Sequence, residues 1–364
     1  MKKRKYLCIL IAIIITATSI CINASATQSD IVTNNIESRI NLIINNSTTY
    51  EIIDQIALES LNNSDKYICY SLSPYGYAIL NTETNSFEEI SPFLTETPYD
   101  DITSDCYYFG PQKYYYMSET GIVNCKTNEE LTFKEYNDFV TVEAKRDSLQ
   151  ELTSTLDSSE LATVTRGVTP EFEFEDNYVS HKNYFTSLLQ NHYPNNQNGT
   201  CTIVACAIML GYYNYYSPSN YYIDSEYCDG CGTNQAFHDL LCTYMNNGPT
   251  GLALARRGII EYLEDRGRYI TTCSVKIGSS ADVFSSVKEK IDEGNPLVAA
   301  MFESYGADYN HSVVVYGYST EYDNTLSQYV SRYYYTHNGW LGSSDATNFM
   351  IYNYSVFADC LYLG

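Results

Sequence analysis

The chain has 364 residues, of which 44% are hydrophobic and 18% are charged, so it is long enough for one large domain or two ordinary domains with buried cores. Its formal net charge of -23 argues against a general binder of phosphate backbones, because that function needs clustered Lys and Arg side chains. We therefore expect no nucleic-acid partner. The 38 tyrosines are typical of half-exposed strands and of binding clefts, and they favour a protein rich in sheet.

The first 26 residues have the pattern of an export signal, with basic residues 2–5, apolar residues 6–22 and the small-residue site Ala24-Ser25-Ala26. We expect cleavage after Ala26, which predicts a secreted protein, free or associated with the cell surface, with no stable membrane insertion. The alternatives are an uncleaved membrane anchor and a lipid-attached Cys21. The apolar run is near the lower length for a spanning helix, and Ile20 is a poor residue to precede a lipid-attached cysteine.

Residues 27–165 have the pattern of a smaller α+β domain. Residues 67–81, "YICYSLSPYGYAILN", contain two alternating runs separated by a turn, which predicts a hairpin. A tyrosine-rich stretch at 106–117 and a helical pattern at 135–156 follow. Residues 157–178 are polar and without periodicity, which predicts an exposed linker and a domain boundary at residue 166.

Residues 166–364 form the second region, in which helical patterns come first and strand patterns last. Helices are predicted near 236–245, 252–266 and 281–293, and strands at "PLVAAMF", "HSVVVYGYS", "YVSRYYYTHNGW" and "NFMIYNYSVFA". This order predicts an α+β fold in which the two kinds of element are segregated.

Cys201 is the candidate nucleophile within "NNQNGTCTIVACAIMLGYYNYY", residues 195–216. The preceding Asn-Gly-Thr is typical of a turn and a helix cap, so Cys201 is predicted in the first helical turn, where unpaired N–H groups favour a thiolate. Cys206 is predicted to point roughly 140° away around the helix and to pack in the core. The alternative is that both cysteines are small buried hydrophobes or halves of disulfides.

His311 is the preferred base among His181, His192, His238, His311 and His337, because it precedes a valine-rich strand at a loop edge. The alternative is a structural surface histidine. The side-chain amide oxygen of Asn338 is expected to accept a hydrogen bond from the imidazole, with Trp340 shielding that bond from water. His337 adjoins Asn338 and, in a strand, points to the opposite face.

Cys201, His311 and Asn338-Gly339-Trp340, in this chain order, resemble the papain-like cysteine peptidases. Within that superfamily, residues 180–364 look most like the short bacterial branch related to bacteriocin-leader-processing peptidases, through the Cys201 helix and the segments 294–301 and 311–318. The resemblance implies a papain-like α+β fold, with a helical part that carries Cys201 and an antiparallel sheet that carries His311 and Asn338. It also implies a protein or peptide substrate and no metal or organic cofactor.

The resemblance further implies a Gln that stabilises the oxyanion together with the backbone N–H of the nucleophile. The family usually places this Gln six residues before the Cys, where this chain has Asn195, whereas Gln197 lies four before it. Gln197 is preferred for its residue type, Asn195 stays the alternative, and an ordinary polar loop without a catalytic role is the third reading.

Residues 70–92 resemble the N-terminal pro-domains of secreted bacterial cysteine peptidases. This implies that residues 27–165 act as an intramolecular inhibitor until the linker near Arg166 is cut. The alternative is a permanent accessory domain.

The cysteine-rich stretch "CDGCGTNQAFHDLLC", residues 228–242, resembles the ligand set of a zinc knuckle but not its spacing. Export and the amphipathic pattern of this stretch favour a disulfide or ordinary packing, and pairings cannot be deduced from the sequence.

The sequence therefore predicts a secreted papain-like cysteine peptidase made as a precursor. The same Cys-His-Asn arrangement also serves amidases and acyl transferases. A further alternative is a catalytically inactive surface-binding protein on a papain-like fold, which binds its partner through tyrosine clusters.

Overall fold

The computed structural model describes most of the chain after residue 34, and it divides the chain into two compact units, residues 1–52 and residues 53–364. The predicted signal sequence and most of the predicted linker lie outside the described residues. The described ranges are 35–45, 47–60, 66–94, 96–111, 113–137, 139–140, 172–188, 192–196, 199–216, 222–269, 273–277, 280–301, 311–324, 328–339, 349–353 and 357–363.

In the first unit, residues 35–44 form a helix whose apolar side chains Ile40 and Ile43 are fully buried. The amide of Asn41 ties this helix to the segment that follows it. Its Nδ2 donates to the backbone oxygen of Tyr50 (2.8 Å), and its Oδ1 accepts from the Tyr50 backbone N–H (2.7 Å).

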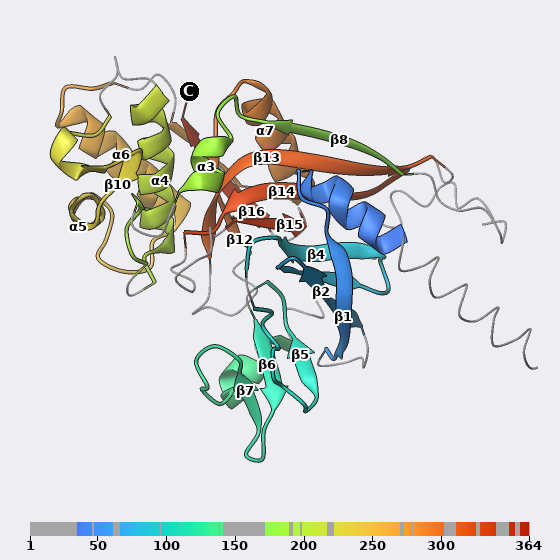
Figure 1. Cartoon of the computed structure of the whole chain (residues 1–364). Helices are drawn as coiled ribbons and strands as arrows, with labels where there is room; N and C mark the ends of the chain where they lie inside the picture. The colour runs from blue at the N-terminus through green and yellow to red at the C-terminus, as the bar shows by residue number, and fades with distance from the viewer. Residues whose placement is uncertain are drawn as a thin grey trace, which may run out of the picture. The chain divides into compact units, whose positions relative to one another are not determined.

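An 11-stranded sheet is the main element of the larger unit, with the order β1-β2-β3-β4-β15-β14-β13-β12-β16-β11 and with β8 added beside β13 (Figure 1). Every pairing with a described register in this sheet is antiparallel, in agreement with the predicted antiparallel sheet. Its strands are β1 (Glu51–Leu58), β2 (Tyr67–Ser73), β3 (Tyr77–Asn81), β4 (Ser86–Ser91), β8 (Phe172–Tyr178), β11 (Cys273–Ile277), β12 (Leu297–Met301), β13 (Ser312–Asp323), β14 (Gln328–His337), β15 (Phe349–Asn353) and β16 (Phe357–Leu363).

Strands from the two predicted regions meet in this sheet, because β4 of the first region pairs with β15 of the second. Ile351 is paired with Ile90 and Tyr352 with Glu89. Next to this junction, Nδ2 of Asn353 lies 3.4 Å from the hydroxyl of Ser86 and 3.4 Å from the backbone oxygen of Phe87. The predicted hairpin strands β2 and β3, with β4, thus continue the sheet of the second region.

The prediction that residues 157–178 form a linker is wrong for its last seven residues, which form β8. This strand pairs with β13 from Phe172 opposite Asp323 to Tyr178 opposite Gly317. Glu173 and Glu175 are exposed, so the strand carries polar residues on its outer side and lacks the apolar pattern of a buried strand.

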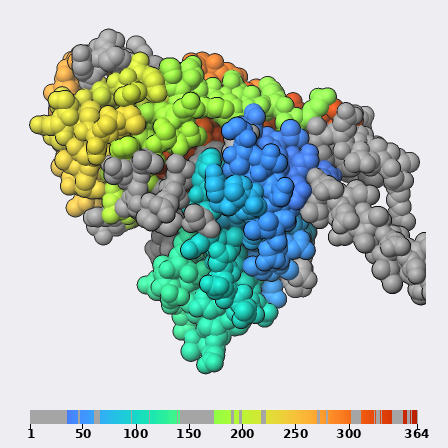
Figure 2. All heavy atoms as spheres, viewed as in Figure 1, coloured from blue at the N-terminus to red at the C-terminus, as the bar shows by residue number. Residues whose placement is uncertain are grey.

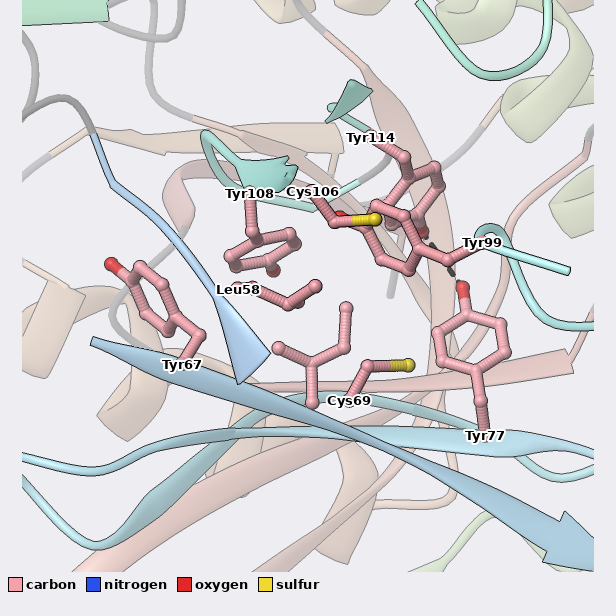
Figure 3. Close-up of a cluster of buried hydrophobic side chains, with 9 residues drawn as sticks. Leu58, Tyr67, Cys69, Tyr77, Tyr99, Cys106, Tyr108 and Tyr114 are labelled. Atoms are coloured by element: carbon pink, nitrogen blue, oxygen red, sulfur yellow. Dashed lines mark hydrogen bonds between the residues drawn. The ribbon is translucent and has the colours of Figure 1, made fainter. Parts of the chain in front are cut away.

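A smaller sheet of β5 (Cys106–Tyr108), β6 (Tyr114–Met117) and β7 (Ile122–Asn124) follows the hairpin strands in the chain. Figure 3 shows the core between this sheet and the hairpin strands, where aromatic side chains point toward one another. The hydroxyls of Tyr77 and Tyr114 lie 2.7 Å apart, and both donate to the carboxylate oxygen Oε1 of Glu89.

The tyrosines were expected in half-exposed strands, but the structure buries many of them completely. Among the described residues, the largest fully buried side chains are all tyrosines. Burial of the ring is compatible with the polar hydroxyl because partners are close, as for Tyr99, whose hydroxyl donates to the backbone oxygen of Tyr107 (2.9 Å).

The described residues of the second region form the helices α3 (Asn183–Ser187), α4 (Cys201–Tyr216), α5 (Gln235–Tyr244), α6 (Leu252–Glu264) and α7 (Ser280–Asp292). The last three confirm the predicted helices. Helices α3, α4, α6 and α7 contact strands of the large sheet, and α5 packs on α4 and α6. The first twelve residues of α4 are all buried, since this helix contacts β12 and β13 as well as α5 and α6 (Figure 1). In Figure 2, atoms of the α5–α6 segment, in yellow, form part of the surface on the face drawn.

Two short strands, β9 (Cys228–Asp229) and β10 (Gly232–Thr233), form a hairpin between the 3-10 helix η3 (Ser225–Tyr227) and α5, and β10 contacts α4. Within the described ranges, the structure contains no helix that is both long and apolar enough to cross a bilayer.

Candidate active site

Cys201 is the first residue of α4, at the point where the chain enters this buried helix. The backbone oxygen of Thr200 accepts hydrogen bonds from the N–H groups of Ile203 (2.9 Å) and Val204 (3.0 Å), which makes Thr200 the residue that caps the helix. Gly199 has a φ of 73°, a conformation that favours glycine and turns the chain into the helix. The predicted position of Cys201 in the first helical turn is confirmed.

The thiol of Cys201 lies against the first residue of β13. Burial raises the pKa of Cys201, and hydrogen bonds from the backbone N–H of Ser312 and from Thr202 partly oppose that rise. The hydroxyls of Thr202 and Ser312 are 2.9 Å apart, which holds the start of the helix on the start of the strand. Cys201 is 8% exposed and Cys206 is 0% exposed, so both cysteines are buried, and Cys201 lies at the contact with β13.

His311 directly precedes β13 and is therefore brought next to the residue that contacts the Cys201 thiol. The Nε2 atom of His311 lies 2.8 Å from the backbone oxygen of Asn338. A carbonyl oxygen only accepts, so Nε2 carries the proton and Nδ1 of the neutral ring is an acceptor. The backbone oxygen of His311 also accepts from the N–H of Met301 at the end of β12 (2.9 Å), which fixes the main chain here.

The contact between His311 and Asn338 differs in one atom from the predicted contact. The sequence assigned it to the side-chain amide of Asn338, whereas in the structure the backbone carbonyl of the same residue accepts the hydrogen bond. The side-chain Nδ2 of Asn338 donates to the sulfur of Met350 at 3.7 Å. Residue spacing alone does not distinguish these two oxygens, because both belong to the same position in the chain.

Gly339 explains why the chain at Asn338 lies so close to α4. Its φ is 65°, and a Cβ atom at this position would lie 3.1 Å from Cγ1 of Val204 and 3.7 Å from Cδ1 of Ile208. A glycine therefore allows the turn after β14 to pack directly on the helix that carries Cys201.

His337, the histidine that was not preferred as base, is fully buried next to Tyr193, with ring centroids 4.8 Å apart and an interplanar angle of 85°. Its Nδ1 accepts from the N–H of Gly339 (3.2 Å). Burial lowers the pKa of His337 to about 4.

The electrostatic surroundings of His311 keep its ring neutral. Burial lowers the pKa of His311 to about 3; the hydrogen bond with Asn338 raises it, and the charges of Lys113 and Lys126 lower it further. Lys113 and Lys126 come from the first region, beside β6 and β7, and Nζ of Lys126 lies 5.1 Å from the ring centroid of Tyr114. In this structure Cys201 is therefore a thiol and His311 a neutral imidazole.

Gln197, the preferred oxyanion residue, and Trp340 lie outside the described residues. Asn195, the alternative oxyanion residue, is half-buried, and its backbone N–H donates to Oε1 of Gln235 in α5 (2.9 Å). The assignment of the oxyanion side chain to Gln197 or Asn195 stays a prediction.

The zinc-like cysteine stretch has other contacts in the structure. His238 lies between Thr200 and Asp239, and its ring nitrogens are 3.7 and 3.8 Å from the sulfur of Cys242. Within the part of the chain that the structure describes, no group of three or more His, Cys, Asp or Glu side chains has the geometry to hold a metal ion. The ten described cysteines are all free thiols.

The sequence reasoning missed four groups of contacts at the site, which come from Thr202, Ser312, Gln235 and the two lysines. Thr200 was predicted only as part of a helix cap, and His238 only as a candidate base or zinc-like ligand. Gln235, His238 and Asp239 occur at helical positions i, i+3 and i+4, a spacing that places polar side chains on one face and offers a usable signal. For Lys113 and Lys126, far away in the sequence, no local pattern indicates a relation to His311.

One of the comparisons with known proteins, that with protein-family models, finds a match. No curated protein and no solved structure matches the chain. Residues 182–350 match the model of the Peptidase_C39 like family, and this segment contains Cys201, His311 and Asn338. The mixed helices and antiparallel sheet of the second region fit a papain-like α+β fold, and the match supports a cysteine peptidase as the activity of residues 182–350.

Proposed function

We infer that the chain is a secreted cysteine peptidase, made as a precursor, which hydrolyses peptide bonds with Cys201 as nucleophile and His311 as base. The observation that carries this inference is that the start of α4 packs on the start of β13, where the hydroxyls of Thr202, next to Cys201, and of Ser312, next to His311, lie 2.9 Å apart. The family match of residues 182–350 adds the reaction class.

In the proposed reaction, Nδ1 of His311 takes the proton of the Cys201 thiol, and the thiolate attacks the carbonyl carbon of the scissile bond. The C–S bond forms while the carbonyl electron pair moves to its oxygen. The oxyanion is held by the backbone N–H of Cys201, at the positive end of α4, and by the side chain of Gln197.

When the intermediate collapses, the C–N bond breaks and His311 returns the proton to the leaving amine. Water then attacks the thioester, with His311 again accepting a proton, and the carboxylic product leaves as Cys201 regains its hydrogen. The carbonyl of Asn338 keeps the proton on Nε2 of His311 throughout, so that Nδ1 is the nitrogen that exchanges protons.

We also infer that residues 27–165 act as an intramolecular inhibitor. In its present surroundings His311 is 5% exposed, and the charges of Lys113 and Lys126 disfavour the imidazolium that the reaction requires. Burial is the largest cause of the lowered pKa of His311, and movement of these lysines away would remove only the smaller contribution of their charges. The direction of that change supports a precursor that gains activity after processing near Arg166.

The test is selective alkylation of the exported protein with iodoacetamide after processing near Arg166, followed by mapping of the labelled cysteines and by assays with peptide substrates. We expect Cys201 to be labelled first and its labelling to be lost in His311→Ala. The Cys206→Ala variant, changed on the same helix but within the core, is the matched control and should keep both labelling and turnover.

Product masses separate the possible reactions. Peptide cleavage supports the peptidase, whereas loss of ammonia from side-chain amides or transfer of the acyl group to an added amine supports an amidase or an acyl transferase. Labelling of Cys201 no faster than that of the other thiols, with no turnover, contradicts an enzymatic function. The mature N-terminus at Thr27, identified in the culture medium, would test export.

A further inference from the structure

The start of α5 contacts two residues of the segment that precedes the nucleophile helix, Asn195 and Thr200. At the first helical position, Oε1 of Gln235 accepts from the backbone N–H of Asn195 at 2.9 Å. One turn later, Nε2 of His238 lies 2.8 Å from the hydroxyl of Thr200, the residue that caps α4. Neither contact involves Cys201, His311 or Asn338, and Asn195, the alternative oxyanion residue, takes part only through its backbone N–H.

His238 is well placed for a fixed contact because it is 4% exposed and Thr200 is 1% exposed. Water therefore competes little for this hydrogen bond. A buried hydrogen bond that loses one partner leaves the other partner unsatisfied, at a cost greater than the net gain from forming it.

The ring of His238 is itself oriented by its neighbours on α5. Nδ1 of His238 lies 3.0 Å from Oδ1 of Asp239, and Nε2 of Gln235 donates to the same carboxylate oxygen (3.0 Å). The hydrogen bonds with His238 and then with Gln235 lower the pKa of Asp239, so this carboxylate is ionised and accepts a hydrogen bond from the Nδ1–H group of His238. The other ring nitrogen, Nε2, then faces the hydroxyl of Thr200. This hydroxyl can either donate to Nε2 or accept from it.

We propose that Gln235 and His238 are positioning residues that hold Asn195 and Thr200 in place, and through Thr200 fix the backbone N–H of Cys201 for the oxyanion. This inference rests on the proposed peptidase function, and it deepens that function by adding two residues outside the Cys-His-Asn set. The N–H of Cys201 is one of the first N–H groups of α4, which have no acceptor within the helix and point out of its N-terminus. Its direction is determined by the peptide bond that joins Thr200 to Cys201.

The proposal predicts that turnover and thiol reactivity respond differently to the same change. Alkylation of Cys201 needs the thiol and His311 but forms no oxyanion, whereas peptide hydrolysis needs both. In the exported protein, His238→Phe and Thr200→Val should lower kcat about 100-fold, the loss expected for a reacting group displaced by about 1 Å. KM and the rate of Cys201 alkylation should stay within about threefold of the original values.

Conservative variants and a double mutant test whether the hydrogen bond is the cause. Thr200→Ser, which keeps the hydroxyl, and His238→Gln, which keeps a polar group, should recover at least part of kcat. The double variant His238→Phe with Thr200→Val should be no worse than either single variant, because both remove the same contact. Gln235→Leu should lower kcat on its own.

The matched control is His181→Gln. His181 is exposed and its ring stacks on Tyr216 at the opposite end of α4, with ring centroids 3.8 Å apart. This variant should keep kcat, KM and the alkylation rate.

Three outcomes contradict the proposal. Unchanged kcat in His238→Phe would overturn it while leaving the peptidase intact. Equal losses of turnover, Cys201 alkylation and thermal stability would mean that His238 serves stability alone. A protein that has been processed near Arg166, yet neither cleaves peptides nor labels selectively at Cys201, would refute the proposed function, and the positioning role with it.

Discussion

The most direct test of the site concerns Asn338, whose backbone carbonyl lies 2.8 Å from Nε2 of His311. Asn338→Ala removes the side-chain amide and its 3.7 Å contact with the sulfur of Met350, but it leaves the backbone oxygen in the chain. Because the hydrogen bond to His311 survives, we expect the loss in kcat/KM to stay below tenfold, which corresponds to about 1.4 kcal/mol.

The loss in kcat/KM for Asn338→Ala would be larger if the side-chain amide of Asn338 accepted the hydrogen bond from the imidazolium of His311. A hydrogen bond to a charged group contributes about 1.5–3 kcal/mol, or roughly 10- to 150-fold in rate. Gly339→Ala provides the contrast, because it disturbs the backbone itself. An L-residue at a φ of 65° costs about 1–2 kcal/mol, and the new Cβ would lie 3.1 Å from Val204. We expect Gly339→Ala to lower kcat more than Asn338→Ala does.

The assay compares kcat, KM and Cys201 alkylation for Asn338→Ala, Gly339→Ala and the original protein, with circular dichroism to verify folding. The reasoning fails if Asn338→Ala, still folded, loses more than about 100-fold in kcat/KM while Gly339→Ala stays near the original value. That result would show that the side chain of Asn338, and not its backbone carbonyl, orients the imidazole of His311.

Three further predictions follow from burial and pairing. Burial lowers the pKa of His311 from an ordinary 6.5 to about 3, so the unfolded chain binds more protons between these values, and stability falls as the pH drops from 6.5 toward 3, by at most about 5 kcal/mol. The change in the urea midpoint between pH 7 and pH 4.5 should become smaller in His311→Gln without vanishing, because buried His337 has a pKa of about 4 and keeps its own pH dependence; an unchanged midpoint shift would contradict the assignment. Tyr114→Phe removes a hydroxyl that donates to the buried Glu89 and should cost about 1–3 kcal/mol in denaturant unfolding, whereas Tyr269→Phe, at an 84% exposed residue, should cost almost nothing. A chain without residues 27–165 loses the pairing of β4 with β15 and the two contacts of Asn353, so its Tm should fall by about 5 °C or more; an equal Tm would show that the pairing adds no stability.

The sequence was informative where the signal was local. Turn residues before Cys201 predicted where α4 begins, and apolar periodicity predicted α5, α6 and α7. The valine-rich run after His311 predicted β13, which places His311 at the strand edge. These features depend on a few neighbouring residues, and local pattern is sufficient for them.

The sequence was less informative where the structure depends on distant partners. A polar strand such as β8 is recognisable only through β13, and the pairing of Glu89 with Tyr352 joins residues more than two hundred positions apart. The choice between the side-chain and backbone oxygens of Asn338 depends on how the turn at Gly339 packs on α4. Contacts between residues far apart in the chain determine each of these three features, and the spacing of residues along the chain does not indicate such contacts.

The pairing of β4 with β15 also bears on what a cut near Arg166 would achieve. Cleavage would break one covalent link, yet the backbone hydrogen bonds and buried side chains of the shared sheet would remain. Before the cut, the tether keeps the two parts at a high effective concentration; afterwards, release depends on dilution and on how fast the strands separate. A nicked but assembled protein is thus the expected first product of processing. Separation of the strands, rather than proteolysis, would then be the slow step that removes the charges of Lys113 and Lys126 from the surroundings of His311.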